Sequence, residues 1–555
     1  MPEEIKRGVA DVHPVDLEHD INSKKQHTEK GAKKVIRKYK PKDVDKTSPL
    51  GILKFEIDEI CQEYGLEKKD IENDMKEILN GDLEFLEQYH RIVENVSILK
   101  LSSNGDGLAI IPGVNDETKK QIAVVPFGLP GDVTTIKVFK SHPYYVESDL
   151  LEVIQPSKDR NDDLINCKYF GKCSGCQYQN VDYQTQLLFK KKTIQNAYKF
   201  LANNIVDQLP PISDTEPSPL LYSYRTKLTP HFNIPFSKQK SSKPLESKPD
   251  LGFGSKGRPT WRKTEGGSGS IVDIEECAIG TEIINQGMDN ERKRFAVEYN
   301  KYKKGATILL REDTKIKTDD LILDAEMAST NPNGEVSTFE ITQNSISYVK
   351  TCVTKSRQIV SEYVNGYKFE FSAGEFFQNN NSILPKVTEY VKDNLNIPNS
   401  KPEELNYLVD AYCGSGLFSI TCSSGVSRVI GVEVSADSVK FAQRNAEINQ
   451  VENAKFIVGK AEAIFNDLDV PANRTSVILD PPRKGCDEVF LTQLSKFNPA
   501  KVVYISCNVH SQARDIDWFL TKSDNGHLYQ IESIKGFDFF PQTHHVESVA
   551  VLSLK

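Results

Sequence analysis

The segment LNYLVDAYCGSG spans residues 405–416 and runs from an apolar strand into a glycine-rich turn. A helix is expected from about Leu417, so the local order is strand, tight turn and helix. Gly414 and Gly416 allow the backbone to turn sharply and to approach a ligand that side chains would block. Strand and helix patterns alternate from Leu384 onward. We therefore predict a multidomain α/β protein in which residues 384–555 form an open α/β sheet.

A nucleoside cofactor site is expected at the edge of this sheet. The next predicted strand, residues 429–432, ends at Glu433, about where an acid meets the ribose hydroxyls of an adenosine cofactor. The dinucleotide fingerprint expects a third glycine where this chain has Ser419, and no arrangement suited to a pyrophosphate is otherwise evident. S-adenosylmethionine, which carries no phosphate, fits better than NAD. The pattern predicts a Rossmann-like fold with Gly414, Gly416 and Glu433 at the cofactor.

Two further predicted strands lead to reactive side chains at the same edge. Residues 477–479 precede Asp480-Pro481-Pro482-Arg483, and residues 502–505 precede Ser506-Cys507-Asn508. Amino-group methyltransferases place a similar acid and proline pair at this edge and follow it with an aromatic residue that stacks on the base. This chain has Arg483 there instead. Together with a cysteine one strand later, the change shifts the expected target from an exocyclic nitrogen to a ring carbon.

A ring carbon requires a nucleophile on the protein. The C5 atom of uracil is too weakly nucleophilic to displace a methyl group from a sulfonium directly, so a nucleophile must first add at C6. Cys507 is our candidate, although a free thiol with a pKa of about 8.5 needs neighbours that favour its ionised form. Glu547 opens the last expected strand and is the candidate base for the C5 proton, because a carboxylate withdrawn from water gains basicity. His545 is the alternative base.

Residues 92–157 change to short β-type runs at residues 96–99, 107–111, 122–126 and 134–138, with glycine-rich turns between them. Four or five short strands in about sixty residues suggest a small OB-like barrel, an architecture that commonly binds oligonucleotides. The segment resembles the TRAM domain of RNA-modifying enzymes, chiefly through VPFGLPGD at residues 125–132.

Residues 158–383 are expected to form a mixed α+β central domain with a group of cysteines. Cys167, Cys173 and Cys176 lie in one glycine-containing loop, and Cys277 is a remote fourth candidate. Four thiolates suit a [4Fe-4S] cluster or zinc, and the C-x5-C-x2-C spacing differs from the paired C-x2-C halves of a zinc ribbon. We expect a structural iron–sulfur cluster, with zinc and unliganded thiols as alternatives.

Two other stretches of the central region stand out by composition. The sequence YRTKL at residues 224–228 predicts a basic, aromatic strand suited to an RNA backbone, although half-exposed strands often have this composition without binding anything. Residues 237–249, rich in lysine and serine, and GGSGS at residues 266–270 are typical of flexible insertions.

The N-terminal part is predicted to be a charged, disordered leader over residues 1–51, followed by a small helical segment over residues 52–91. Residues 30–42 of the leader carry seven basic side chains and no acid. Such a stretch suits either a solvated tail or an arm that binds phosphate.

Composition limits the class of protein. With 555 residues, 38% hydrophobic content and no apolar run long enough for a bilayer, the chain is expected to be a multidomain protein outside the membrane. The N-terminus lacks the apolar core of a signal peptide, so we expect a reducing, cytoplasmic location without disulfides, with nuclear and mitochondrial pools as alternatives. A net charge of −8 is compatible with RNA as a partner, because a local basic surface can bind phosphate. The oligomeric state is not indicated, and a monomer is assumed.

From about Ile92 to its end the chain resembles the RNA uracil-5 methyltransferase family, which makes 5-methyluridine. The resemblance rests on FFQN (376–379), YCGSG (412–416), DPPR (480–483), SCN (506–508) and HVES (545–548). It implies that Gln378, Tyr412, Glu433 and Asp480 contact S-adenosylmethionine, that Cys507 is the nucleophile and that Glu547 accepts the proton. It also implies an iron–sulfur site in those members that keep the four cysteines. Leu417 departs from the family, where a polar residue often follows the second glycine.

The long leader and the insertions resemble fungal-type members of the family, which act on uridine 54 in the T arm of tRNA. We therefore expect tRNA as the substrate, with the target base flipped out of its stack. Ribosomal RNA is the alternative, because a cysteine cluster with a TRAM barrel also occurs in bacterial enzymes that modify it. A protein that only binds or chaperones RNA and an amino-group methyltransferase are the other classes considered.

Overall fold

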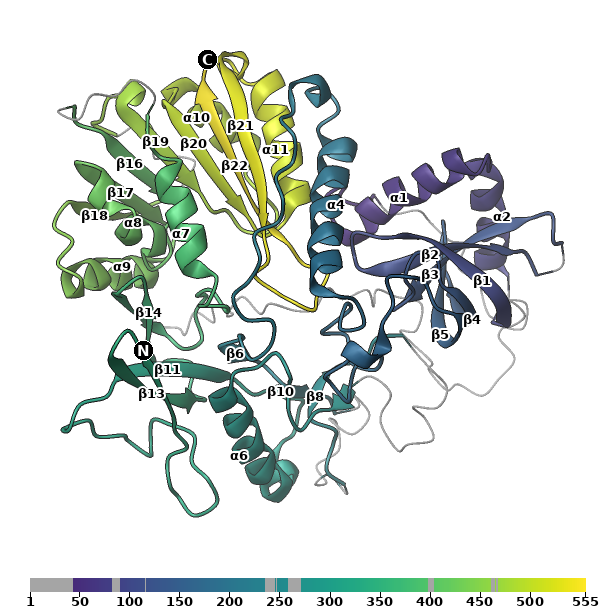
Figure 1. Ribbon diagram of the computed structural model, residues 1–555, viewed down its shortest axis with the longest axis horizontal. Coiled ribbons are helices and arrows are strands. Elements are labelled where there is room, and N and C mark those ends of the chain that lie inside the picture. The colour runs from purple at the N-terminus through teal and green to yellow at the C-terminus, as the bar shows by residue number, and fades with distance from the viewer. Residues whose placement is uncertain are drawn as a thin grey trace, which may run out of the picture.

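The computed structural model describes residues 43–81, 90–114, 116–234, 245, 247–257, 271–397, 404–460, 465 and 468–555. These residues form a barrel with two helices beside it, a central segment of small sheets, and a large open sheet flanked by helices (Figure 1). Residues 1–42 of the expected leader and the expected glycine–serine insertion at residues 266–270 lie outside the described residues.

The C-terminal sheet has the strand order β18-β17-β16-β19-β20-β22-β21. The strands are β16 Tyr407–Ala411, β17 Arg428–Glu433, β18 Ala454–Val458, β19 Thr475–Leu479, β20 Lys501–Ser506, β21 Tyr529–Phe537 and β22 Glu547–Leu554. Strands β18 to β20 pair in parallel, and β22 lies antiparallel between β20 and β21. The order changes direction between β16 and β19, the switch point where ligands bind in such sheets. The expected Rossmann-like sheet is confirmed.

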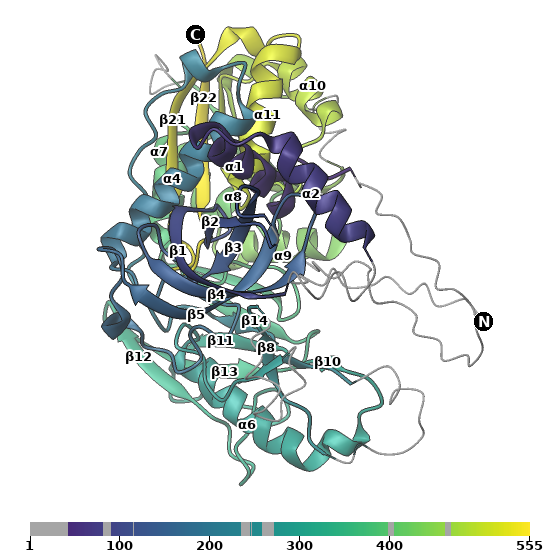
Figure 2. The same cartoon turned by 90° about the vertical axis from the view of Figure 1, so that its right-hand side faces the viewer.

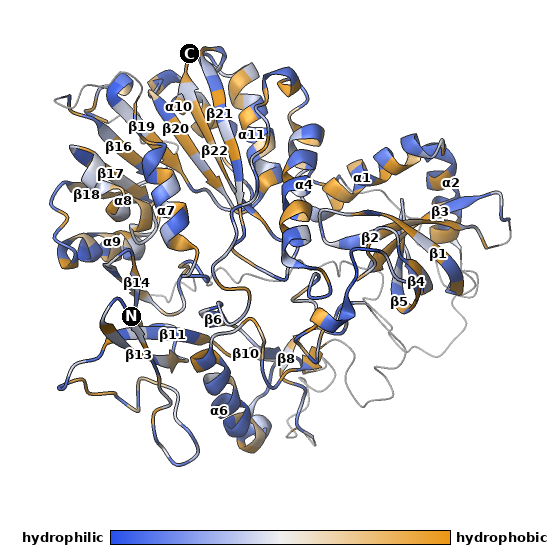
Figure 3. Ribbon diagram, in the orientation of Figure 1, coloured by the Kyte–Doolittle hydropathy of each residue, from blue (hydrophilic) through white to orange (hydrophobic). Residues whose placement is uncertain are grey.

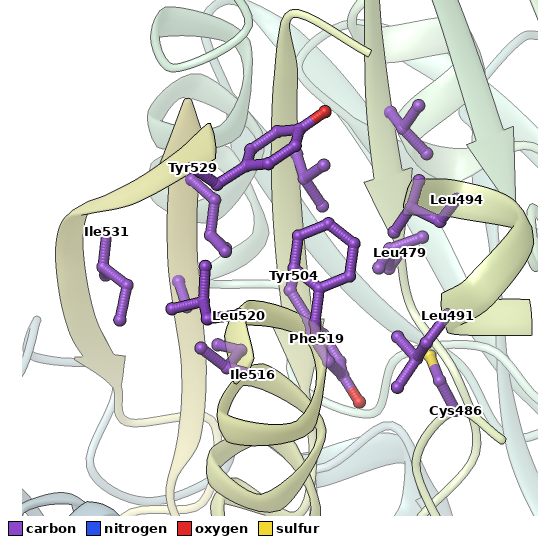
Figure 4. Packing of buried hydrophobic residues seen from close by; sticks show 14 of the residues in the cluster. Leu479, Cys486, Leu491, Leu494, Tyr504, Ile516, Phe519, Leu520, Tyr529 and Ile531 are labelled. Atoms are coloured by element: carbon purple, nitrogen blue, oxygen red, sulfur yellow. The ribbon is translucent and has the colours of Figure 1, made fainter. Parts of the chain in front are cut away.

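Helices cover both faces of this sheet. They are α7 Leu384–Asp393, α8 Leu417–Thr421, α9 Ala436–Ile448, α10 Glu488–Phe497, α11 Val509–Lys522 and, from the central segment, α4 Tyr183–Leu201. Successive strand residues point to opposite faces, so Val409 and Val477 belong to one hydrophobic cluster and Leu408 and Ile478 to the other. Figure 3 shows the resulting apolar strands between helices with polar outer faces. Figure 4 shows part of the first cluster, where α11 packs beside Tyr504.

The carboxyl ends of the parallel strands face the central segment. The chain ends just beyond β22 at the far edge, so the parallel strands, which run against β22, end at the side nearest β6 and β11 (Figure 1). Side chains that follow β16, β17, β19 and β20 therefore gather between the sheet and the central segment.

The barrel is closed by five strands in the order β1-β2-β3-β5-β4. They are β1 Ile92–Leu101, β2 Asp106–Pro112, β3 Lys120–Pro126, β4 Val133–Ser141 and β5 Val146–Gln155. Helices α1 (Pro49–Glu63) and α2 (Lys68–Asn80) lie against it (Figure 2), and Ile57, Ile60 and Met75 share one apolar cluster with the barrel. The expected small barrel is confirmed. The helices begin slightly before residue 52, because Ser48 caps α1 by accepting a hydrogen bond from the Gly51 amide at 3.1 Å.

The central segment is mixed α+β, as expected. Its sheets have the orders β10-β7-β8-β9 and β12-β13-β11-β6, and β14 pairs with β15 as a hairpin. The elements are β6 Lys227–Leu228, β7 His231–Phe232, β8 Gly252–Gly254, β9 Ile271–Asp273, α6 Glu282–Glu298, β10 Ala306–Thr307, β11 Leu310–Ile316, β12 Phe339–Gln343, β13 Ile346–Val353, β14 Ile359–Val364 and β15 Tyr367–Ser372.

The strand expected at residues 224–228 is shorter than predicted, since only Lys227–Leu228 pair in a sheet. The preceding residues make other contacts: Arg225 forms isolated bridges with both Gly280 and Asn380. Within the described ranges, no helix is both long enough and apolar enough to cross a membrane.

Candidate active site

Cys507 occupies the turn between the end of β20 and the start of α11. Ser506 Oγ donates to the Asn508 carbonyl at 2.9 Å and accepts from the Asn508 amide at 3.1 Å. Asn508 caps α11, its side-chain oxygen accepting from the His510 amide at 3.2 Å. These bonds fix the backbone on both sides of Cys507, so the direction of its thiol is set by the turn.

Glu547 is placed beside this turn by strand register. Ser506 pairs with Ser548 in the antiparallel β20–β22 ladder, so the next positions outward on the two strands are Cys507 and Glu547. Burial, and to a smaller degree Asp480, raises the pKa of Glu547 to about 8, while Arg483 opposes the shift. A carboxyl group with this pKa can both take and release a proton near neutral pH.

The Cys507 thiol is protonated in the free protein. Burial raises its pKa to about 12, and the charges of Glu547 and Asp480 raise it further, against the lowering effect of Arg483. The thiol, the two carboxyl groups and the guanidinium therefore lie within electrostatic reach of one another. Ionisation of Cys507 therefore requires a base that accepts its proton, or a substrate over which the negative charge of the sulfur is delocalised.

Asp480 and Arg483 belong to the loop after β19. Asn508 Nδ2 and Ser511 Oγ donate to the Arg483 carbonyl at 3.0 and 2.7 Å, which ties this loop to the Cys507 turn. Burial and the charge of Asp410 raise the pKa of Asp480 to about 7. The loops that follow β19 and β20 therefore lie together at one edge of the sheet.

The glycine turn adopts the sharply turned backbone that glycine allows. Tyr412, Gly414 and Gly416 have φ angles of +72°, +53° and +90°. Glu433 Oε2 accepts from the Gly414 amide at 3.3 Å and its other oxygen accepts from the Ser435 amide at 2.9 Å. A Cβ atom added to Gly414 would meet nothing within 4 Å, so the turn leaves open space at the switch point.

Asp410 is a site residue that the sequence did not single out. It is the penultimate residue of β16, just before the turn, is fully buried, and accepts a hydrogen bond from Ser419 Oγ at 2.6 Å. Burial raises the pKa of Asp410 to about 7. Ser419 stands where the dinucleotide fingerprint has glycine, and its hydroxyl is used inside the protein. The sequence signal that could have identified Asp410 is the position of an acidic residue just before the glycine turn.

Gln378 is buried in the loop between β15 and α7. Its neighbour Phe377 stacks on Phe371 with ring centroids 4.3 Å apart and shares an apolar cluster with Cys413 and Leu417 of the glycine turn. The preceding Phe376 side chain is 72% exposed. The loop that carries Gln378 therefore borders the predicted cofactor turn on the side of the central segment.

His545, the alternative base, is held neutral. Burial lowers the pKa of His545 well below its usual value, and the charges of Arg483 and His544 lower it further. Its ring meets Phe540 edge-on at 5.3 Å. A buried imidazole with so low a proton affinity is a poorer base than Glu547.

The four cysteines of the central segment are half-buried free thiols. Burial raises the pKa of Cys176, and the charges of Cys277, Cys173 and Cys167 raise it further, so the four share one neighbourhood. Among the residues that the structure describes, no three His, Cys, Asp or Glu side chains are arranged to hold a metal ion. The thiols lack the mutual geometry of a ligand set, and no chemical step is assigned to a cluster.

Comparisons with known proteins agree with this geometry. A family model for tRNA (uracil-5-)-methyltransferases matches residues 341–555, and one for the TRAM domain matches residues 87–151. A tRNA (uracil(54)-C(5))-methyltransferase of Saccharomyces cerevisiae is 54% identical over 98% of this chain and 88% of its own length. A protein of the same description from Schizosaccharomyces pombe is 42% identical over 96% of this chain and 88% of its own.

A solved structure has the same fold. The Pyrococcus abyssi tRNA (uracil-54, C5)-methyltransferase, in complex with S-adenosyl-L-homocysteine, superposes with a TM-score of 0.53 at 23% identity, covering 83% of this chain and 100% of that chain. With the sequence relatives above and a cysteine and a carboxylate paired at the sheet edge, the chain belongs to the tRNA (uracil-5-)-methyltransferase family, whose members methylate C5 of uracil in RNA.

Proposed function

We propose that this protein transfers a methyl group from S-adenosylmethionine to C5 of uridine 54 in the T arm of tRNA. The observation that carries the proposal is the register of β20 and β22, which sets Cys507 beside Glu547 at the carboxyl edge of the sheet. The two yeast relatives, whose names give uracil 54 of tRNA as their target, support the choice of substrate.

The residues of the switch point fit the cofactor. Gly414 stands in open space at the turn, and Glu433 lies at the end of β17, where ribose hydroxyls bind. We assign Asp480, which follows β19, and Gln378, in the loop between β15 and α7, to the same site. S-adenosylmethionine, when bound, supplies a methyl group on a positively charged sulfur. Buried carboxyl groups on this side of the sheet favour such a cation.

Cys507 and Glu547 divide the remaining chemistry. The sulfur of Cys507 bonds to C6 while its proton passes to solvent, and the C5=C6 electron pair moves toward C5 and O4 so that C5 becomes nucleophilic. After methylation, Glu547 removes the proton from C5, the double bond re-forms and the C6–sulfur bond breaks. A pKa of about 8 suits Glu547 to this proton transfer at neutral pH.

A covalent trap tests the proposal. Fluorine at C5 blocks the final proton removal, so tRNA containing 5-fluorouridine should become joined to the protein in the presence of S-adenosylmethionine, with Cys507 as the linked residue. Cys507→Ala should form no adduct and no product while retaining RNA affinity. A tRNA with cytidine at position 54 is the matched control for the site. Adduct formation with that control, or methylation by Cys507→Ala, would refute the assignment.

We also propose that the four cysteines of the central segment bind an iron–sulfur cluster, on the basis of their chemistry and proximity. Three thiols in a glycine-containing loop and the thiol of Cys277, all within electrostatic reach of one another, have the chemistry of a ligand set, although the described side chains are not arranged as one. Protein purified without oxygen should contain about four iron and four sulfide ions per chain, and Cys176→Ser should lose both. Fully folded protein that contains neither iron nor sulfide would exclude the cluster.

A further inference from the structure

A short strip of the central segment joins two active-site loops. Tyr224 is buried, and its hydroxyl donates to the Pro541 carbonyl at 3.0 Å, in the loop that leads to Glu547. Two residues later, the Thr226 amide donates to the Asn379 carbonyl at 2.9 Å, in the loop that carries Gln378. One strip of three residues therefore contacts the loop on the cofactor side and the loop on the base side.

The strip is itself fixed to the central segment. The Arg225 amide donates to the Ile279 carbonyl at 2.8 Å, and the Arg225 carbonyl accepts from the Thr281 amide at 3.1 Å. The Glu312 amide of β11 donates to the Thr226 carbonyl at 2.9 Å. A backbone held on both sides in this way cannot shift toward one loop without breaking bonds elsewhere.

Arg311 of β11 reinforces the contact with the cofactor-side loop. It is fully buried, its guanidinium lies 4.7 Å from the centre of the Phe371 ring, and Nη1 donates to Asn379 Oδ1 at 3.1 Å. Its Nε and Nη2 atoms have no hydrogen-bond partner. The charges of Glu362 and Glu312 offset part of the cost of burying this cation, but two of its donors remain unsatisfied, which makes a purely structural arginine unfavourable here.

We propose that Tyr224, Thr226 and Arg311 form a bracket that sets the separation between Gln378 and Glu547, and thus between the bound methyl donor and the base. The three are positioning residues, since they contact loops rather than the reacting atoms. The bracket lies at the open edge of the catalytic sheet, between β6, β11 and the ends of the parallel strands (Figure 1). This inference rests on the proposed function of the two loops.

The two arms of the bracket predict different kinetic effects. Tyr224→Phe removes the hydroxyl that holds the base-side loop, so kcat should fall about ten- to a hundred-fold while KM for S-adenosylmethionine stays within about two-fold. With a slower proton removal, the methylated covalent intermediate should accumulate on ordinary tRNA. Arg311→Met and Asn379→Ala should instead raise KM for S-adenosylmethionine about ten-fold with a smaller change in kcat.

A double-variant cycle tests whether Arg311 acts through Asn379. If it does, adding Arg311→Met to Asn379→Ala causes no further rise in KM. Tyr529→Phe is the matched control, because Tyr529 is also a buried tyrosine whose hydroxyl donates to a proline carbonyl, that of Pro499, at the opposite edge of the sheet. It should lower the melting temperature as Tyr224→Phe does but leave kcat and KM unchanged.

The outcomes separate the bracket from the function itself. Parallel losses in kcat, KM and melting temperature for Tyr224→Phe and Tyr529→Phe, or additive effects of Arg311→Met and Asn379→Ala, would overturn the bracket while the wild-type protein still methylates tRNA. If Arg311→Met does not fold, Asn379→Ala and Tyr224→Phe still distinguish the two arms. A wild-type protein that neither methylates nor traps tRNA would instead overturn the proposed function.

Discussion

Cys507 and Glu547 affect each other's ionisation, because both are acidic groups buried at the same site. Each negative charge makes the other harder to form, and burial raises both pKa values, to about 12 for the thiol and about 8 for the carboxyl. At neutral pH the free site therefore carries less negative charge than its residue types suggest. When the sulfur adds to the substrate, the thiol proton passes to solvent and the negative charge spreads onto the pyrimidine, so Glu547 ionises more easily.

Glu547→Gln should block the last step of the reaction. The amide cannot take the C5 proton, so a methylated covalent intermediate should accumulate and kcat should fall about 10²- to 10⁴-fold. The base form of Glu547 is populated as pH rises through its pKa of about 8, so kcat of the wild type should increase with pH up to that value. The increase should be absent in the variant, as rapid-quench assays across pH would show.

Glu532→Gln provides the matched control for this prediction. Glu532 lies exposed on β21 of the same sheet and pairs with Lys501 at 3.0 Å. Lys501 is buried, so the variant is expected to lose some stability, but the pair is remote from the reacting residues and the kinetics of Glu532→Gln should match the wild type. Normal turnover by Glu547→Gln would assign the proton to another group.

For single residues, the sequence predicted the site residues that lie at the ends of strands. It missed the residue whose place depends on a contact with a distant part of the chain. Cys507 and Glu547 each follow or open an apolar run, so their place at the sheet edge could be inferred. The role of Asp410 could not, because it rests on a 2.6 Å hydrogen bond from Ser419, nine residues away on the next helix. Ser419 was considered only as a missing glycine.

At the scale of elements, long periodic segments were predictable and short ones were not. The strands of the catalytic sheet and the barrel are runs of five to ten residues with a clear apolar pattern. Residues 224–228 have a strand-like composition, yet only two of them pair in a sheet. Their neighbours Ile279 and Asn379 are distant in sequence, and the pattern of one segment contains no information about such partners.

At the scale of the whole molecule, the barrel and central segment pack directly against the catalytic loops. Gln177, next to the cysteine loop, accepts a hydrogen bond from the His544 amide at 3.2 Å, and an added Cβ on Gly105 of the barrel would come within 2.8 Å of His544 Cβ. These contacts join residues more than 350 positions apart. The active-site loops are therefore held by contacts from the barrel, the central segment and the catalytic sheet. Their conformation could not be predicted from the sequence of any one of these parts.

A further long-range contact of the same loop is the buried ion pair of Lys190 and Asp538. Lys190 lies on α4 and Asp538 in the loop between β21 and β22, and both side chains are fully buried. Lys190 also donates to the Phe540 carbonyl at 3.0 Å. Burial lowers the pKa of Lys190, and the charge of Asp538 opposes the shift. The pair ties the helix that covers the sheet to the loop that leads to Glu547.

Removing one partner should cost more than removing both. Lys190→Met leaves the Asp538 carboxylate buried without a counter-ion, so it should lower the free energy of unfolding by about 3–5 kcal/mol. Lys190→Met combined with Asp538→Asn leaves no uncompensated charge and should recover a large part of that loss. Urea unfolding of the single and double variants, followed by tryptophan fluorescence and circular dichroism, measures the difference. If the double variant is as unstable as the sum of the two single ones, the ion pair does not hold the helix and the loop together.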